Sequence, residues 1–277
     1  MIRIVSGWSA PGGSTVAHIE LTNLFNNNDI PCKFYGPHDW MLDQCESEQL
    51  TQEEIGSLSF LEQGDTLIVH ACPISIKDRG GNWLHKTVYS CHETNVYPMD
   101  QVNYKNFDFI HYVSRYQDDW HGLSYPSVVI PNVICEDLVP GEVVREFEDH
   151  GKTTAGVIGS VDAHKRTHLA IEEALKAGHS KVLIFGAITD PMYYDRKVAA
   201  LVDGEKVQYA GITKDKTSMY ACIDEVFHAS PRETFNLVKH ECTKAQVKYT
   251  SVFKETGTDS YLPSKRVLEM WKECLDL

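Results

Sequence analysis

Several features are missing from this 277-residue sequence, and each absence excludes a class of protein. No run of 18 or more consecutive apolar residues occurs, so a membrane-spanning helix is not expected. Residues 1–7 have the pattern of a β-strand, and no apolar run of signal-peptide length follows them, so a secretory signal is not expected. We therefore expect a cytoplasmic protein.

Two metal-binding patterns are also missing. The sequence has eight cysteines, but no two of them have Cys-x-x-Cys spacing. In a chain of this length without a secretory signal, such cysteines are typical of reduced, mostly buried thiols. No Asp-x-Asp motif occurs either, so we expect no metal-binding residues. A zinc site assembled from distant cysteine and histidine side chains stays open at this point.

Positive charge is scarce in the first half of the chain. Residues 1–150 contain 8 Lys and Arg against 22 Asp and Glu, a balance of −14, whereas residues 151–277 contain 18 against 17, a balance of +1. The first half would therefore repel a polyanion, and the second half is neutral enough to hold a diphosphate. This distribution argues against broad nucleic-acid binding.

Near-continuous apolar runs alternate with helical patterns along the whole chain, which is typical of parallel sheets covered on both faces. In the first half we expect strands at residues 2–6, 31–35, 65–70, 87–91, 109–114 and 127–130, with helices at 16–25 and 51–61. In the second half we expect strands at 155–159, 181–185, 207–210 and 226–229, with helices at 167–177, 192–201, 217–223, from 237 onward, and 263–277.

The acidic segment 136–151 loses the apolar pattern, which indicates a linker. We therefore predict an N-terminal domain over residues 1–132, a linker over 133–152, and a C-terminal domain over 153–277 that includes the terminal helix. The predicted fold class is α/β, with two doubly wound, Rossmann-like parallel-sheet domains facing a cleft. Ligands of such sheets bind beyond the carboxyl ends of the strands.

The segment 226–241 carries the most specific functional pattern. A short apolar strand is followed by a turn and then by a helix for which Asn236 is a candidate N-cap. The free N–H groups at the start of such a helix bind anions, above all phosphates. Glu233 falls in the loop, and Glu241 falls about two turns into the helix, where a carboxylate can accept hydrogen bonds from a ribose diol. The pattern suits a nucleotide sugar, although two solvated glutamates beside a loop would look the same.

This segment resembles the two-glutamate motif of retaining glycosyltransferases of the GT-B fold, similar to glycosyltransferase family 4, and the resemblance covers roughly residues 2–247. In the first half, Gly12 and Gly13 resemble the family's glycine loop, which approaches the donor phosphates and the acceptor. His92 matches the histidine of the sugar pocket. An ordinary turn at the two glycines and a structural histidine are the alternatives.

In the second half, Gly156–Lys165 resembles the segment that supplies an arginine and a lysine to the diphosphate. Lys165 falls on the lysine position, but Ser160 stands where the family has arginine. Either Arg166 or Arg232 compensates, or the leaving group is stabilised less strongly. A solvent-facing loop lysine is the alternative for Lys165.

Two further segments of the second half match the family's donor site. Gly211 and Ile212 match the segment near the nucleobase. The amides around Phe235, Asn236 and Leu237 would hold phosphate and sugar oxygens. After Glu241 the sequence is shorter than the family pattern, which indicates a member trimmed at its C-terminus.

The resemblance implies a retaining, metal-independent hexosyl- or pentosyltransferase that moves a sugar from a nucleoside-diphosphate sugar, in particular a UDP-sugar, to a hydroxyl acceptor. Glu233, Lys165 and His92 would be its catalytic residues, and no cofactor beyond the donor substrate is expected. The acceptor is open between a glycan, a small molecule and a hydroxymethylated base of phage DNA, with the acidic first half counting against DNA. A nucleotide-sugar epimerase or hydrolase on the same fold, or an inactive sugar-nucleotide-binding protein, are the alternatives.

Overall fold

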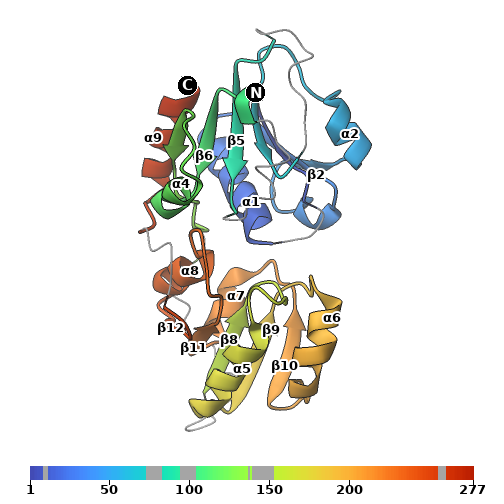
Figure 1. Cartoon of the computed structure of the whole chain (residues 1–277), viewed down its shortest axis with the longest axis vertical. Coiled ribbons are helices and arrows are strands. Elements are labelled where there is room, and N and C mark those ends of the chain that lie inside the picture. Colours follow the sequence, from blue (N-terminus) through green and yellow to red (C-terminus); the bar gives the residue numbers. More distant parts are fainter. Residues whose placement is uncertain (9–11, 73–82, 94–103, 137, 139–152, 255–259) are drawn as a thin grey trace. The chain divides into compact units, whose positions relative to one another are not determined.

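The protein forms two compact α/β units. The computed structural model describes residues 1–8, 12–72, 83–93, 104–136, 138, 153–254 and 260–277. The first unit comprises Met1–Ile134 and Gly257–Leu277, and the second comprises Cys135–Thr256. Each unit is built on one parallel sheet (Figure 1). No helix in the described ranges is long and apolar enough to cross a membrane.

The first sheet has seven parallel strands in the order β3-β2-β1-β4-β5-β6-β7. Their bounds are β1 (Ile2–Ser6), β2 (Cys32–Gly36), β3 (Ser47–Gln49), β4 (Thr66–His70), β5 (Lys86–Cys91), β6 (Phe109–Tyr112) and β7 (Ser127–Val129). The helices of this unit are α1 (Gly13–Asn26), α2 (Gln52–Ser57), α4 (Arg115–His121) and α9 (Ser264–Leu275). The strand order reverses between β1 and β4, so the carboxyl ends of these two strands form a topological switch point.

Alternating side chains of the sheet build two cores in the first unit. Ile2 and Ile4 of β1 contribute to the core that contains α1 and α9, whereas Val5 contributes to the core on the other side, which contains Ile55 of α2. All four of these isoleucine and valine side chains are buried. This follows from the period of two residues in a strand, which turns successive side chains to opposite faces.

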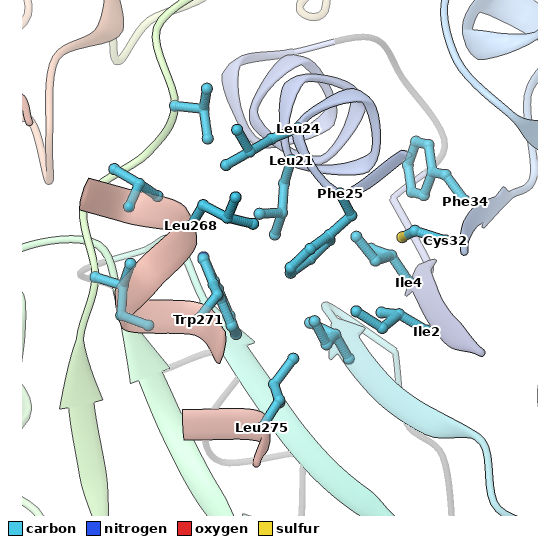
Figure 2. Close-up of a cluster of buried hydrophobic side chains, with 14 of the residues drawn as sticks. Ile2, Ile4, Leu21, Leu24, Phe25, Cys32, Phe34, Leu268, Trp271 and Leu275 are labelled. Carbon is cyan, nitrogen blue, oxygen red and sulfur yellow. The ribbon is translucent and has the colours of Figure 1, made fainter. Parts of the chain in front are cut away.

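The C-terminal helix corrects one expected boundary. We predicted residues 153–277 as one domain, but α9 belongs to the first unit. Its buried face consists of Val267, Leu268, Trp271 and Leu275, which pack with residues of α1, β1 and β2 (Figure 2). The sequence reveals an amphipathic helix, but an apolar stripe does not say which sheet will cover it.

The second sheet has five parallel strands in the order β10-β9-β8-β11-β12. Their bounds are β8 (Thr154–Ile158), β9 (Lys181–Phe185), β10 (Val207–Gly211), β11 (Glu225–His228) and β12 (Lys248–Ser251). The helices are α5 (Thr167–Lys176), α6 (Pro191–Tyr193), α7 (Lys216–Ala221) and α8 (Leu237–Ala245). Here the strand order reverses between β8 and β11, which places a second switch point at their carboxyl ends.

Two helices differ from expectation for local reasons. The helix predicted over 51–61 begins with a Thr51–Glu54 capping box, but it ends at Ser57 because Leu58 adopts a left-handed conformation. The helix predicted over 192–201 is divided into α6, a π-helical turn (Tyr194–Val198) and a 3-10 turn (Ala199–Leu201). Of the predicted linker, residues 137 and 139–152 lie outside the described part of the chain.

Candidate active site

The switch point of the second sheet carries an ion pair between two residues that the sequence singled out. Lys165 lies in the loop after β8, and Glu233 lies in the loop after β11. The Lys165 Nζ atom lies 2.5 Å from Glu233 Oε1. His228, the last residue of β11, places its Nε2 atom 2.9 Å from the same oxygen. Residues from two neighbouring strand ends therefore meet at the position where sheets of this type bind ligands.

The charge of Glu233 is fixed by these contacts. Burial by itself raises the pKa of Glu233, but the positive charge of Lys165 and the hydrogen bond from His228 outweigh burial and hold this pKa well below its usual range. Glu233 is therefore a carboxylate at any physiological pH. Its side chain is 12% exposed, so a ligand that reaches the ammonium of Lys165 also reaches this carboxylate.

The loop between β8 and α5 is held close to the sheet by two glycines and an aspartate. A Cβ atom on Gly186 would lie 1.9 Å from the carbonyl oxygen of Gly159, so the chain can approach this closely only with glycine at position 186. Asp162 accepts hydrogen bonds from the Lys165 backbone N–H at 2.8 Å and from the Ser160 hydroxyl at 2.5 Å. Ser160, at the expected arginine position, thus orders the loop and adds no positive charge.

Neither candidate replacement for that arginine is engaged with Glu233 in the structure. The Arg166 guanidinium lies over the ring of Phe253, 5.1 Å from the ring centroid. The backbone carbonyl of Arg232 accepts a hydrogen bond from His164 Nε2 at 3.1 Å, which fixes the loop before Glu233. The positive charge beside Glu233 comes from Lys165.

The helix start predicted near Asn236 is confirmed. Asn236 is the N-cap of α8, and its Oδ1 atom accepts a hydrogen bond from the Lys239 N–H at 3.1 Å. Its Nδ2 atom donates to the Tyr249 hydroxyl at 2.8 Å, which ties the cap to β12. Phe235 is buried and stacks on His240, with 4.6 Å between ring centroids. The first residue of α8 is Leu237, so the positive end of the helix dipole lies just after the loop of Glu233.

Glu241 is engaged by a different pair of residues. Its Oε1 atom lies 2.7 Å from Lys216 Nζ, and its Oε2 atom accepts a hydrogen bond from the Tyr220 hydroxyl at 2.9 Å. The two glutamates of the motif therefore have separate partners in the structure. Lys165, the partner of Glu233, was among the residues singled out from the sequence, whereas Lys216 was not.

The carboxyl end of β10 adds an apolar surface. Gly211 closes the strand with a φ of +79°, a conformation that favours glycine, and its carbonyl oxygen accepts a hydrogen bond from Gly186 N–H at 2.8 Å. The next residue, Ile212, is 45% exposed. An exposed isoleucine at this edge is available to contact a flat ring.

The first unit positions the other candidate residues at its own switch point. Gly12 is the N-cap of α1, and Gly13 is the first residue of that helix. Gly12 has an extended backbone, and a Cβ atom at this position would meet no described atom within 4 Å. The described part of the fold therefore leaves room for a side chain at this position.

His92 follows β5 and lies within a cluster of four histidines, together with His18, His70 and His111. Its Nε2 atom lies 3.2 Å from the Ser90 hydroxyl. Burial, reinforced by the neighbouring histidines, lowers the pKa of His92 well below 6.5, so its ring is neutral at neutral pH. A small pocket beside this cluster, with space for about one water molecule, is lined in part by His92, His111 and Trp271.

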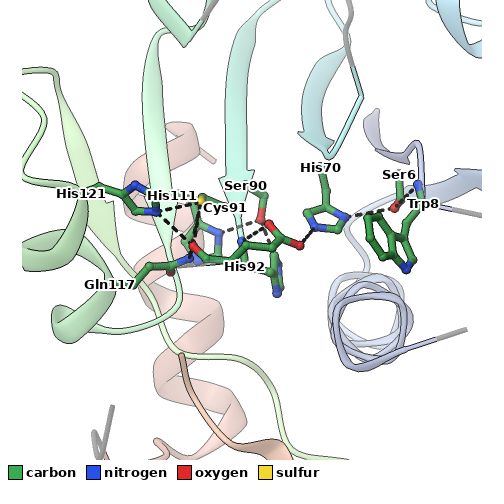
Figure 3. Close-up of polar contacts among 10 residues, drawn as sticks. Ser6, Trp8, His70, Ser90, Cys91, His92, His111, Gln117 and His121 are labelled. Atoms are coloured by element: carbon green, nitrogen blue, oxygen red, sulfur yellow. Dashed lines mark hydrogen bonds and ion pairs between the residues drawn. The ribbon is translucent and has the colours of Figure 1, made fainter. Parts of the chain in front are cut away.

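A chain of hydrogen bonds crosses the switch point of the first sheet (Figure 3). The Ser6 hydroxyl, at the end of β1, lies 3.0 Å from His70 Nδ1, at the end of β4. His70 Nε2 lies 2.9 Å from a carboxylate oxygen of Glu93. We did not single out Ser6 or His70 from the sequence, although both end predicted strands, and that position alone could have marked them.

No group of three or more histidine, cysteine or acidic side chains within the described ranges has a geometry that could hold a metal ion.

Within the second unit, the described candidates lie around the carboxyl ends of β8, β10 and β11. Gly12, Gly13 and His92 belong to the first unit.

No protein-family model matches the sequence, and no curated protein matches it either. Solved structures do match along nearly the whole chain. HepE of Anabaena, crystallised with UDP-glucose, has a TM-score of 0.70 and 15% identity, over 100% of this chain and 90% of that one. The pneumococcal O-GlcNAc transferase GtfA, crystallised with UDP and GlcNAc, has a TM-score of 0.63 and 10% identity, over 99% and 91% of the two chains.

A third structure is WaaG, a glycosyltransferase involved in lipopolysaccharide biosynthesis. It has a TM-score of 0.60 and 10% identity, over 100% of this chain and 91% of that one. At these identities the likeness shows the fold alone. The expected fold class is confirmed, since the chain has two parallel-sheet α/β units and the GT-B fold of these glycosyltransferases.

Proposed function

We propose that this protein is a retaining glycosyltransferase that transfers a sugar from a nucleoside-diphosphate sugar to a hydroxyl group. The observation that carries the proposal is the Lys165–Glu233 ion pair at the switch point of the second sheet, directly before the N-terminus of α8. An ammonium group and a helix N-terminus together favour a diphosphate. A carboxylate at the same place favours the hydroxyl groups of a sugar.

In this proposal, donor binding redistributes the contacts of Lys165. The ammonium group turns from Glu233 to the diphosphate and stabilises the negative charge that develops as the diphosphate leaves. Glu233 is then released to accept hydrogen bonds from the donor sugar, while His228 keeps the carboxylate oriented. The backbone N–H groups around Phe235 and Leu237 contact phosphate or sugar oxygens.

The nucleoside would lie toward β10 and α8. Glu241 would accept hydrogen bonds from the ribose diol, and Gly211 with the exposed Ile212 would lie beside the nucleobase. We propose UDP as the nucleotide, because HepE, which shares this fold over the whole chain, was crystallised with UDP-glucose. Arg166 and Arg232 remain candidates for an additional contact with the diphosphate.

The reaction proposed here retains the anomeric configuration and needs no metal ion. The two described groups that contact Glu233 are Lys165 and His228, so this carboxylate faces hydrogen-bond donors and positive charge. The acceptor would then be deprotonated with the help of the donor phosphate on the face from which the diphosphate leaves. For Gly12, Gly13 and the neutral ring of His92, which belong to the first unit, we propose contacts with the substrates.

The decisive experiment measures nucleotide release by the purified chain from a panel of UDP-, GDP- and ADP-sugars, each with and without acceptors. The acceptors are oligosaccharides, small alcohols, and DNA with or without 5-hydroxymethylcytosine, and a parallel series contains EDTA. We expect acceptor-dependent release that survives EDTA and a product with the donor's anomeric configuration by NMR.

Other outcomes would support other functions. Equal turnover of the donor with and without acceptor would indicate a hydrolase or epimerase on the same fold. Tight nucleotide binding without turnover would indicate an inactive sugar-nucleotide-binding protein. The serine at position 160, where arginine was expected, favours this alternative. Loss of transfer in EDTA, with recovery in magnesium or manganese, would contradict the proposed metal independence.

A further inference from the structure

Helices α7 and α8 both belong to the second unit (Figure 1). Helix α7 presents two hydrogen-bond donors to a single carboxylate on α8. Lys216 is the first residue of α7, and Tyr220 lies four residues later. Residues at this spacing lie on the same face of a helix. Both side chains reach Glu241, one to each carboxylate oxygen, at 2.7 and 2.9 Å.

The three residues of this arrangement are largely buried. Glu241 is 4% exposed and Tyr220 is 2% exposed, and the Lys216 side chain is 17% exposed. A buried ion pair contributes little net stability, because desolvation of both charges offsets their attraction, and apolar side chains would fill the same space as well or better. Removal of one partner alone leaves a buried charge uncompensated.

The phenol of Tyr220 is a fixed donor. Burial, followed by the negative charge of Glu241, raises the pKa of Tyr220 well above its usual value of 10. Tyr220 therefore stays protonated and donates its hydrogen to Glu241. Lys216 then supplies the positive charge that balances the carboxylate.

A count of lone pairs shows what this carboxylate can still bind. An ionised carboxylate has about four acceptor sites on its two oxygens. Lys216 and Tyr220 occupy one site on each oxygen. About two sites remain, one on each oxygen, which is the number that the two hydroxyl groups of a ribose require.

We propose that Lys216 and Tyr220 are positioning residues that hold Glu241 as an oriented acceptor for the ribose diol and so make the protein select ribonucleotides over 2′-deoxyribonucleotides. This inference rests on the proposed function, because it takes Glu241 as the ribose contact. It adds two residues, 25 and 21 positions away from Glu241, that set the selectivity without touching the reacting atoms.

A second lysine–glutamate ion pair of the second unit provides a control. Lys248 forms an ion pair with Glu225, with 2.9 Å between Nζ and Oε2. Glu225 is also buried, but it is the first residue of β11 and therefore lies at the amino end of the sheet, away from the proposed site. Loss of Lys248 should disturb a buried glutamate without disturbing ribose recognition.

The test uses the full chain and isothermal titration calorimetry. UDP, ADP, GDP and CDP are first compared on the wild type, and the tightest is then compared with its 2′-deoxy form. We expect the wild type to prefer the ribonucleotide by at least about tenfold, as a hydrogen bond to a charged group implies. Lys216→Met should reduce this preference to within about twofold, and Tyr220→Phe should reduce it by about threefold. Lys248→Met should leave the preference unchanged.

The outcomes separate this inference from the proposed function. If the wild type prefers the ribonucleotide and Lys216→Met and Tyr220→Phe prefer it equally, Glu241 does not depend on them and the inference is overturned while the function stands. If the wild type binds both forms equally, Glu241 does not recognise the 2′-hydroxyl and the inference is overturned while nucleotide binding stands. If the wild type binds no nucleoside diphosphate, the proposed donor site is wrong and the inference falls with it. Should Lys216→Met fail to fold by circular dichroism, Lys216→Gln carries the same expectation.

Discussion

Lys165 and Glu233 form an ion pair, so the removal of either one changes the charge of the proposed site. We expect Lys165→Ala to lower turnover on the order of 100-fold, the effect of losing one preorganised electrostatic contact to a developing negative charge. Acceptor affinity should change much less, because the Lys165 contact strengthens as the diphosphate leaves. Steady-state kinetics with varied acceptor measures both quantities.

A lysine elsewhere in the same unit provides the control for Lys165→Ala. Lys176 lies on α5, where its side chain is 76% exposed and pairs with Glu173 at 3.2 Å. Lys176→Ala should leave turnover unchanged, since an exposed pair of this kind contributes little. Equal turnover of wild type and Lys165→Ala would instead show that Lys165 does not contribute to catalysis. Arg166 or Arg232 would then be the candidate phosphate contact.

The buried His111 makes the stability of the first unit depend on pH. Burial lowers the pKa of His111 from 6.5 to about 4. His111 Nε2 lies 2.8 Å from the Ile130 carbonyl, and Nδ1 lies 2.9 Å from the Ser90 hydroxyl, a pattern that a neutral ring satisfies by donating from Nε2 and accepting at Nδ1. The unfolded chain binds this proton near pH 6.5 and the folded chain does not. Stability is therefore complete above pH 6.5 and falls between pH 6.5 and 4.

Since one pKa unit corresponds to about 1.4 kcal/mol, this histidine alone accounts for about 3 kcal/mol of lost stability at pH 4. His111→Gln should flatten the profile by up to that amount, because a neutral amide can keep both hydrogen bonds. Denaturant unfolding at a series of pH values measures it. All five tryptophans, at positions 8, 40, 83, 120 and 271, belong to the first unit, so their fluorescence reports on that unit alone. Parallel profiles for wild type and variant would contradict the role of His111.

At the scale of elements, α9 completes the core of the first unit from the far end of the chain. Trp271 is 1% exposed and packs against Phe25 and His111, with ring centroids 6.2 and 4.6 Å apart. We expect Trp271→Ala to lower the free energy of unfolding of the first unit by about 3–5 kcal/mol, the usual effect of removing a large buried aromatic side chain.

The remaining four tryptophans report the unfolding of this unit in the Trp271→Ala variant. Trp120→Ala is the control, because Trp120 is 47% exposed and its loss creates no buried cavity. If Trp271→Ala unfolds at the same denaturant concentration as the wild type, the packing of Trp271 shown in Figure 2 does not stabilise the first unit.

The elements that the sequence predicted are those with strong apolar runs. The strands that became β1, β4 and β9 lie within about one residue of their expected bounds. In contrast, β3 consists of the polar residues Ser47–Gln49, and β12 begins at an exposed lysine. Such strands form because a neighbouring strand offers free hydrogen-bonding groups, and this is not visible in their own side chains.

Some residues of the candidate site could likewise be predicted from the sequence, and others could not. Glu233 and Asn236 could be singled out because they lie just beyond a strand end or at a helix start, positions that local sequence defines. Lys165 could be singled out because its segment resembles one of GT-B glycosyltransferases. The contact of Lys216 with Glu241 could not be predicted, because it depends on how α7 packs against α8. A residue 25 positions away leaves no periodic signal in the sequence.

At the scale of the whole molecule, the charge is divided between the two halves of the chain. Residues 1–150 carry a balance of −14 and residues 151–277 a balance of +1, so a free diphosphate should be opposed by the first half. The second unit contains all the features proposed to bind phosphate and ribose, namely Lys165, the start of α8 and Glu241. The donor should therefore bind to the second unit, and turnover should require both.

Hydrogen exchange of the full chain with and without UDP tests this division of roles. A bound nucleotide protects backbone amides that it contacts or orders. We expect protection first in residues 159–166, 209–213 and 231–242, which contain the loop after β8, the end of β10 and the start of α8. A chain with Glu241→Ala should lose the protection near α8 at the same UDP concentration. Protection confined to residues 1–130 would reverse the assigned roles of the two units and, with them, the proposed donor site.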